Sequence, residues 1–277
     1  MLLTAGMRLD SRGAIGVFDS GVGGLTVLRA LLDRFPREST LYLGDTARVP
    51  YGTRSAEVVT RYALANARFL LEREIKLLVV ACNTASAVGL TALSRALTVP
   101  VIGVIAPGAR VAAARTRNGR VGVIGTLGTI ASGAYQRAVA DARPGALVRA
   151  RACPLFVPLA EEGWTQGEVP RLTALEYLAE LSESGVDTLV LGCTHYPLLR
   201  EVIAQVMGPG VALVDSAEAV ADAVEAELRA RNLFSPGDRA PSHAYFVTDV
   251  PHRFLEVGAR FLGRPIPHAE QVDIVPV

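Results

Sequence analysis

Short aliphatic runs alternate with longer segments of helical period along most of this chain, and this alternation limits the folds it can adopt. The runs IGVF (15–18), TLYLG (40–44) and LLVVA (77–81) read as strands, because they are short and rich in leucine and β-branched residues. The segments between them, LTVLRALLDRF and VVTRYALANARFLLERE, read as helices. Strand and helix in alternation predict an α/β fold, in which helices flank a mostly parallel sheet.

The same order of elements recurs in the second half of the chain. Residues 15–18 overlie 121–124, Leu41 and Tyr42 overlie Leu147 and Val148, 75–82 overlie 186–193, and 101–104 overlie 211–214. Two of the three cysteines, Cys82 and Cys193, take the same place in both copies, where a strand ends and a helix is expected to start. We interpret the pattern as an internal duplication that builds two similar α/β lobes, with pseudo-twofold related halves and an active-site cleft between them.

The lobe boundaries follow from this duplication. We expect the second lobe to comprise residues 106–216 and the first lobe to be discontinuous, with residues 1–105 plus 217–277. The loop FSPGDRAPS precedes one more strand signal at 244–248 and the helical segment HRFLEVGARFLG, which we expect to complete the first lobe.

Charge and composition exclude several classes of partner. Lys and Arg total 28 and Asp and Glu total 27, with no basic stripe, so we expect neither nucleic acid nor an anionic membrane as a partner. The longest uncharged run, 77–94, contains Cys, Asn, Thr, Ser and Gly, which a membrane span disfavours. The first residues lack the pattern of a secretion signal, and three widely spaced cysteines fit a reducing, cytoplasmic setting.

The residues that follow the predicted strands are the candidates for a site, because ligands of open α/β sheets bind at the carboxyl ends of strands. They are small hydroxyls, amides, one acid, one imidazole and two thiols. In the first lobe they include Asp19, Ser20, Tyr51, Gly52, Cys82, Asn83 and Thr84, and in the second lobe Thr126, Thr129, Cys193, Thr194 and His195.

Three other interpretations of these residues are weaker. The glycine-rich turn after the first strand lacks the spacing of a dinucleotide or P-loop motif, so its glycines are better explained by a helix that starts close to a strand. Cys82, Cys193 and His195 could hold zinc, but no CxxC or HxxxH pair accompanies them. A Cys193–His195 nucleophile leaves Cys82 unexplained. Cys153 lies outside the duplicated pattern and is expected to be a buried bystander.

A symmetric reaction explains both strand-end thiols. To invert a carbon centre through its proton, a base on one face removes hydrogen while an acid on the other face delivers it, and the reverse reaction exchanges the roles. Thiols suit both tasks, because an ordinary cysteine pKa near 8.5 can be tuned by its surroundings.

Five segments of this sequence carry a resemblance to a known family. They are FDSGVGGLTVL (18–28), YLGDTARVPYG (42–52), ACNTAS (81–86), CPLFVPLAEEG (153–163) and GCTHYPLL (192–199). Together they closely resemble the glutamate racemases of the aspartate/glutamate racemase family, over nearly the whole chain. The resemblance implies a cofactor-independent and metal-free isomerase that interconverts L- and D-glutamate and supplies D-glutamate for cell-wall peptidoglycan. It also implies a small-molecule substrate, glutamate, and leaves open a homodimer.

The resemblance also assigns roles to individual residues. It implies that Cys82 and Cys193 are the acid/base catalysts, that Asp19 assists Cys82, and that His195 assists Cys193. Glu161 matches a further acid near the second thiol, although the sequence alone does not separate it from Glu162. The implied substrate contacts are Asp19, Ser20, Tyr51, Gly52, Asn83, Thr84, Thr126, Thr129, Thr194 and His195.

The chemistry of the chain is compatible with those roles and leaves two alternatives open. Its single lysine, Lys76, lies away from the strand ends, which argues against a Schiff base with pyridoxal phosphate. We expect Asp19 and His195 to hold or relay a proton more than to lower a thiol pKa. The alternatives are a racemase of aspartate or another amino acid on the same fold, and a two-lobed small-molecule binding protein without turnover.

Overall fold

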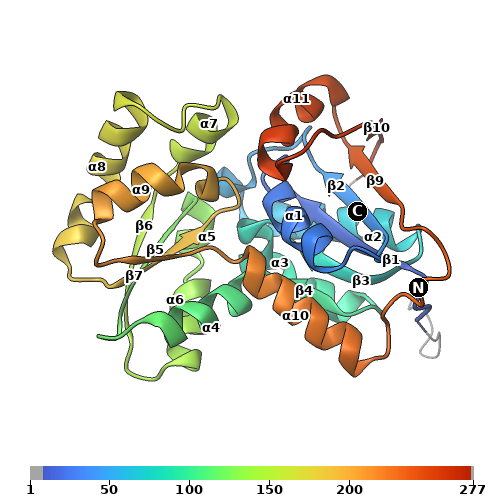
Figure 1. Ribbon diagram of the computed structural model, residues 1–277, viewed down its shortest axis with the longest axis horizontal. Coiled ribbons are helices and arrows are strands. Elements are labelled where there is room, and N and C mark those ends of the chain that lie inside the picture. Colours follow the sequence, from blue (N-terminus) through green and yellow to red (C-terminus); the bar gives the residue numbers. More distant parts are fainter. Residues whose placement is uncertain (1–8, 276–277) are drawn as a thin grey trace.

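The computed structural model describes residues 9–275 and contains two parallel sheets, one in each lobe (Figure 1). The larger sheet has six strands in the order β10-β9-β2-β1-β3-β4, and the smaller has four in the order β6-β5-β7-β8. All pairs are parallel. The predicted fold class, an α/β protein of two similar lobes with helix-flanked parallel sheets, is confirmed. The first-sheet strands are β1 (Ala14–Asp19), β2 (Thr40–Gly44), β3 (Ile75–Val80), β4 (Val101–Gly103), β9 (His243–Val247) and β10 (Glu270–Gln271).

The second sheet repeats the strand order of the first. The order β2-β1-β3-β4 returns as β6-β5-β7-β8, while β9 pairs with β2 and extends only the first sheet. Each lobe therefore places its first strand centrally, with the ends of β1 and β3, or of β5 and β7, side by side. The second-sheet strands are β5 (Arg120–Gly125), β6 (Leu147–Ala152), β7 (Thr188–Gly192) and β8 (Ala212–Val214).

Helices cover both sheets, and among the described residues none is long and apolar enough to cross a membrane. The helices that accompany the first sheet are α1 (Leu25–Arg34), α2 (Ala56–Leu71), α3 (Asn83–Ala96), α10 (Ala217–Ala230) and α11 (Pro251–Leu262), with the 3-10 turn η1 (Tyr51–Thr53). Those of the second lobe are α4 (Ile105–Arg115), α5 (Leu127–Ala131), α6 (Ala134–Ala142), α7 (Phe156–Glu161), α8 (Glu168–Glu183) and α9 (Arg200–Met207), with η2 (Tyr196–Leu199).

Burial on both faces explains why the strands read as continuous apolar runs rather than alternating ones. Successive side chains of a strand point to opposite faces. In β1, Ile15 and Val17 join the apolar cluster that contains α1, α10 and α11, whereas Phe18 joins the cluster that contains α2 and α3. The first of these clusters continues into the second lobe, so the two lobes share apolar contacts.

Strand register corrects part of the predicted overlay of the two halves. Ile15 pairs with Thr40, and its counterpart Val121 pairs with Val148, so Tyr42 corresponds to Ala150 and not to Val148. The overlay of β4 on β8 is likewise two residues out, whereas that of β3 on β7 is correct. A slip of two residues keeps every side chain on the same face of the sheet, so an apolar pattern cannot detect it.

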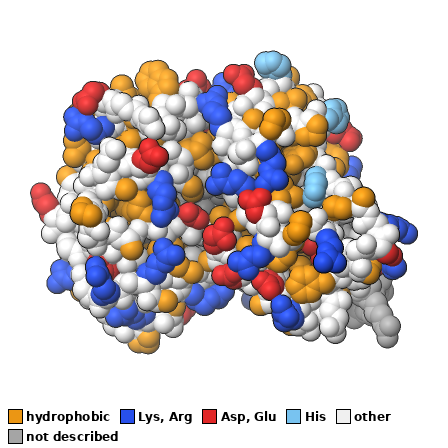
Figure 2. Space-filling model, viewed as in Figure 1, with side chains coloured by type: hydrophobic (Ala, Val, Ile, Leu, Met, Phe, Trp, Pro, Cys, Tyr) orange, Lys and Arg blue, Asp and Glu red, His pale blue; other side chains and the backbone are white. Residues whose placement is uncertain are grey.

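The surface carries charges of both signs. Figure 2 shows arginines and acidic side chains interspersed over the visible face, with no large area of one sign. Many of these charges are paired, as between Arg34 of α1 and Asp222 of α10 at 2.9 Å.

Candidate active site

A small pocket lies where the carboxyl ends of the two sheets meet. Its walls come from the segments after β1, β2 and β3 in one lobe and after β5, β6 and β7 in the other. The free space is about 30 Å³, room for one or two water molecules. The pocket is lined by Ser20, Val49, Pro50, Tyr51, Gly52, Cys82, Asn83, Thr84, Thr126, Val157, Cys193, Thr194 and His195.

The structure thus brings together the residues that the strand-end rule selected. Both thiols face this pocket, which the sequence hypothesis required. Three further candidates lie directly behind the walls: Asp19 next to Cys82, Thr129 next to Thr84, and Glu161 next to His195. The sequence analysis missed three lining residues, Val49, Pro50 and Val157, because they are apolar and carry no chemical signal.

Cys82 is held at the start of a helix. It is the N-cap of α3, and its sulfur accepts a hydrogen bond from the Ala85 N–H at 3.4 Å. Burial and the nearby Asp19 carboxylate raise the pKa of Cys82 to about 12, against the hydrogen bonds from Ala85 and Ser20. Cys82 therefore carries its proton at neutral pH.

Asp19 is completely buried beside that thiol. Burial raises its pKa, while the charge of His195 and backbone N–H groups, including that of Gly21 at 3.1 Å, oppose the rise. Its Oδ1 has no hydrogen-bond partner among residues 9–275. A buried carboxylate oxygen with spare capacity can accept a proton, which fits a proton-holding role better than activation of Cys82 as a thiolate.

Cys193 follows β7 but does not lie at a helix N-terminus, contrary to the prediction. Residues 193–195 form a turn, η2 begins at Tyr196, and α9 begins at Arg200. An α-helix that started at Thr194 would need the N–H of Pro197 to bond the Cys193 carbonyl, and proline has none. Any negative charge on the Cys193 sulfur must therefore be stabilised by side chains and not by the N–H groups of a helix start.

His195 supplies that stabilisation. Its Nδ1 lies 3.8 Å from the Cys193 sulfur, and its Nε2 lies 2.9 Å from Glu161 Oε1. Burial disfavours the imidazolium, but the hydrogen bonds and charges of Cys193 and Glu161 outweigh it and raise the pKa of His195 to about 10. A protonated imidazole at this distance stabilises a thiolate at Cys193. That His195 holds or relays a proton stays a prediction.

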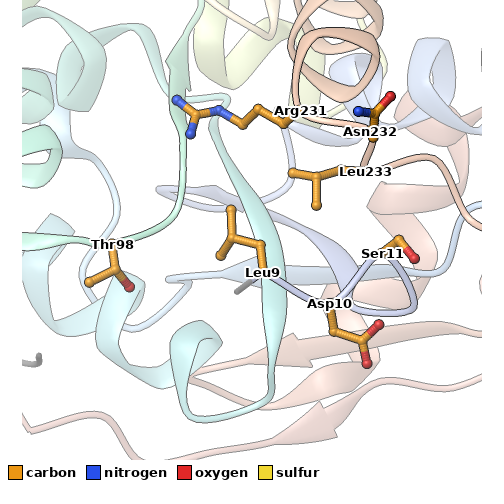
Figure 3. Close-up of a pocket in the computed structure, with 7 residues that line it drawn as sticks. All are labelled: Leu9, Asp10, Ser11, Thr98, Arg231, Asn232 and Leu233. Atoms are coloured by element: carbon orange, nitrogen blue, oxygen red, sulfur yellow. The ribbon is translucent and has the colours of Figure 1, made fainter. Parts of the chain in front are cut away.

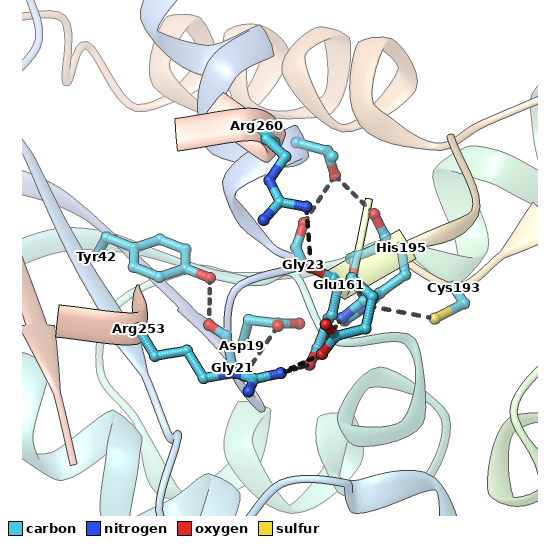
Figure 4. Close-up of polar contacts among 12 residues, drawn as sticks. Asp19, Gly21, Gly23, Tyr42, Glu161, Cys193, His195, Arg253 and Arg260 are labelled. Atoms are coloured by element: carbon cyan, nitrogen blue, oxygen red, sulfur yellow. Dashed lines mark hydrogen bonds and ion pairs between the residues drawn. The ribbon is translucent and has the colours of Figure 1, made fainter. Parts of the chain in front are cut away.

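Glu161, and not Glu162, faces the site. Figure 4 shows Glu161 between His195 and two arginines of α11, Arg253 and Arg260. Hydrogen bonding and charge from His195 lower the pKa of Glu161 despite its partial burial, so it stays ionised. Glu162 instead points to solvent and pairs with Arg253 at 2.9 Å.

Three threonine hydroxyls join the lobes at the opposite wall. Thr84 of α3 lies 2.9 Å from Thr126 and 3.2 Å from Thr129, which are themselves 3.0 Å apart. Thr126 is also the N-cap of α5. Hydroxyls can donate and accept, so this ring can turn its donors toward an anion in the pocket.

Two tyrosines support the walls through buried hydrogen bonds. Tyr51 donates to the buried Asp45 carboxylate and accepts from Asn66 at 3.0 Å. Tyr135, which the sequence analysis did not single out, donates to Asn83 Oδ1 at 2.7 Å. Its only sequence signal is an aromatic residue near the start of a helix, which is too common to indicate a site.

The remaining candidates lie elsewhere. Cys153 is fully buried outside the pocket, as expected, with its sulfur 3.7 Å from the Arg151 carbonyl. Within the described part of the chain, no group of three or more His, Cys, Asp or Glu side chains is arranged to hold a metal ion. Lys76 lies within β3, buried against Glu38, and its ammonium donates to the Ser11 carbonyl at 2.7 Å.

A much larger cavity elsewhere is not the site. A space of about 690 Å³ lies near the amino ends of the first-sheet strands and is lined by Leu9, Asp10, Ser11, Thr98, Arg231, Asn232 and Leu233 (Figure 3). It holds no cysteine, histidine or helix N-terminus. Convergent titratable groups, and not volume, therefore mark the smaller pocket as the candidate active site.

Comparisons with known proteins identify the family of this chain. The Asp/Glu/hydantoin racemase family model matches residues 15–224. A glutamate racemase from Geobacter metallireducens is 60% identical over 94% of this chain and 97% of its own length. A glutamate racemase crystal structure from Bacillus anthracis is 40% identical with a TM-score of 0.90, covering 96% of this chain and 98% of that one. Another from Francisella tularensis, in complex with D-glutamate, is 37% identical with a TM-score of 0.89, covering 95% and 98%. This chain belongs to the Asp/Glu/hydantoin racemase family.

Proposed function

We propose that this protein is a glutamate racemase that interconverts L- and D-glutamate by direct proton transfer between Cys82 and Cys193. The observation that carries the proposal is the convergence of two buried thiols, one from each lobe, on one small pocket. The names of its close relatives, reported above, support glutamate as the substrate.

The two thiols have complementary partners, which suits a two-base reaction. Cys82 carries a proton beside the Asp19 carboxylate, and Cys193 lies beside a protonated His195. In one direction the Cys193 thiolate removes the α-proton, and the Cys82 thiol delivers its proton to the other face of the carbon. The reaction leaves Cys82 as the thiolate and Cys193 as the thiol, and the reverse direction starts from that state.

Neutral donors receive the substrate carboxylates. No lysine or arginine is among the pocket's lining residues, so recognition rests on backbone N–H groups at the start of α3 and on the Asn83, Thr84 and Thr126 side chains. A helix N-terminus favours an anion through its unpaired N–H groups and the helix dipole.

Without an electron sink, the barrier must fall through preorganised hydrogen bonds in a site that excludes water. The free space of about 30 Å³ excludes bulk water but is far too small for a five-carbon diacid. The lobes must therefore separate from the arrangement described above to admit glutamate, and they can close only as far as the bound substrate allows.

Isotope exchange tests the proposal. In deuterated water, either enantiomer should lose its α-hydrogen to solvent as its configuration is lost, because each thiol exchanges its proton. Cys82→Ser and Cys193→Ser should each lower the racemisation rate by several orders of magnitude, since serine is a far weaker acid. Racemisation without solvent label, or full activity in either variant, contradicts the two-thiol reaction.

A substrate panel tests the alternatives. Polarimetry with L-glutamate, L-aspartate and other L-amino acids identifies the preferred side chain, and turnover of aspartate over glutamate would redirect the proposal to an aspartate racemase. Tight binding of glutamate with no isotope exchange would instead indicate a binding protein.

We further propose a cytoplasmic enzyme that supplies D-glutamate for cell-wall peptidoglycan and forms a homodimer. Three free, buried thiols are compatible with a reducing compartment. Leu155, Trp164 and Val169, each about half exposed, cluster on α7, α8 and the loop between them and could be covered by a second copy. Analytical ultracentrifugation measures the mass in solution, and a monomer at all concentrations would refute the dimer.

A further inference from the structure

The side-chain amide of Asn83 is satisfied at one end only. Its Oδ1 accepts a hydrogen bond of 2.7 Å from Tyr135, while its Nδ2 is buried and has no hydrogen-bond partner among residues 9–275. Asn83 itself lines the pocket. Buried amide N–H groups in folded proteins are nearly always paired, so this donor calls for an acceptor that arrives with a ligand.

Tyr135 determines which end of the amide faces the ligand. Its ring is 1% exposed and packs against Gly192, and burial raises its pKa, so the hydroxyl keeps its proton. An amide has a donor end and an acceptor end that exchange when it rotates by a half turn. With Oδ1 held by Tyr135, the NH₂ group points away from Tyr135.

The geometry points to Tyr135 as a positioning residue that holds the Asn83 amide with its NH₂ group toward a substrate carboxylate. This inference rests on the proposed function. Glutamate offers an ammonium group, which only donates, and two carboxylates, which accept. The free Nδ2 donor therefore matches a carboxylate, whereas a rotated amide would present an oxygen that repels it.

The contact also couples recognition to closure. Tyr135 lies on α6 in the second lobe, and Asn83 begins α3 in the first. The amide is fixed only when the lobes are together, so an open site lacks one oriented donor and a closed site has it.

Substitution of the hydroxyl alone tests the role. Tyr135→Phe should raise KM for both glutamate enantiomers about tenfold or more, the range expected for a lost hydrogen bond to a charged group, with kcat changed much less. Tyr177→Phe is the matched control, because it removes a second-lobe hydroxyl that accepts from the Leu155 N–H outside the pocket. It should leave KM and kcat unchanged.

A double-mutant cycle separates positioning from a purely structural role. If Tyr135 acts through the amide, Tyr135→Phe should add almost nothing to KM in an Asn83→Ala background. An equal rise in KM in both backgrounds, or a fall in kcat with a lowered Tm, would show that Tyr135 only packs the lobes and would overturn the inference. Racemisation by the unsubstituted protein tests the proposed function separately. If that protein does not racemise glutamate, the proposed function is wrong whatever the variants show.

Discussion

Gly23 lies where the first lobe approaches Thr194 and His195 of the second, and adding one methyl group there should push these side chains away. A Cβ atom at Gly23 would lie 2.2 Å from Thr194 Oγ1 and 2.5 Å from His195 Nδ1. Ordinary contact begins near 3.4 Å, so Thr194 must move by roughly 1.2 Å. The φ of Gly23 is not in the left-handed region, so Gly23→Ala introduces a clash without backbone strain.

A displacement of this size has a predictable cost. A misplacement of about 1 Å between reacting groups can lower a rate by about 100-fold. We therefore expect Gly23→Ala to lower kcat/KM for glutamate by about two orders of magnitude, measured by circular dichroism as optical activity is lost. Overpacking costs about 1–3 kcal/mol when the structure cannot relax, which corresponds to a Tm lowered by several degrees in a folded protein.

Gly210→Ala provides the control for this variant. A Cβ at Gly210 meets no atom within 4 Å, and its φ is not left-handed, so activity and Tm should be unchanged. If Gly23→Ala is folded and retains activity within threefold of the unsubstituted protein, the steric argument is wrong and the lobes tolerate a wider spacing than the pocket implies.

Three further predictions follow from buried charges. Glu161→Gln removes a charge that raises the pKa of His195, so the alkaline limb of kcat should shift to lower pH, whereas the exposed Glu162→Gln should not move it. Because the folded pKa of about 10 exceeds the ordinary 6.5, the stability that His195 contributes should be complete below pH 6.5 and lost as pH rises through 10, in urea titrations. A Glu161→Gln profile identical to the unsubstituted one would show that Glu161 does not support the imidazolium. Lys76→Met leaves a buried carboxylate unpaired and should cost about 3–5 kcal/mol of unfolding free energy. Arg12→Met, in a half-exposed ion pair, should cost less than about 1 kcal/mol, and equal costs for the two variants would count against this account.

Local patterns were enough to predict the strands and the fold class. The predicted strand at 40–44 coincides with β2, and the other predicted strands differ from the observed bounds by a few residues at their ends. The alignment of the two sheets was not predictable. The sequence overlay matched Tyr42 with Val148, whereas the strand register matches it with Ala150, two residues further along the strand. Only hydrogen bonding between strands, which is absent from a single-sequence pattern, distinguishes the two alignments.

The site was predictable where chemistry coincides with strand ends and not elsewhere. Cys82 and Asn83 follow β3 directly, so topology alone places them at the pocket. Tyr135 lies on a helix 52 residues from Asn83, and no local pattern reports that contact. The prediction of a helix directly after Cys193 was wrong, and the sequence contains the reason. Pro197 lies four residues after Cys193 and has no N–H to donate to the Cys193 carbonyl.

Several polar contacts between the lobes are made by residues that would touch the substrate. Thr84 meets Thr126 across one wall, Asn83 meets Tyr135 beside it, and Gly52 approaches Thr126 so closely that an added Cβ would lie 2.6 Å from it. Any opening that admits glutamate must break these hydrogen bonds, and the carboxylates then offer replacement acceptors to the same donors. Hydrogen bonds to the substrate can thus replace, when the lobes close, the hydrogen bonds that opening broke. The groups that would recognise glutamate therefore also help to hold the two lobes together.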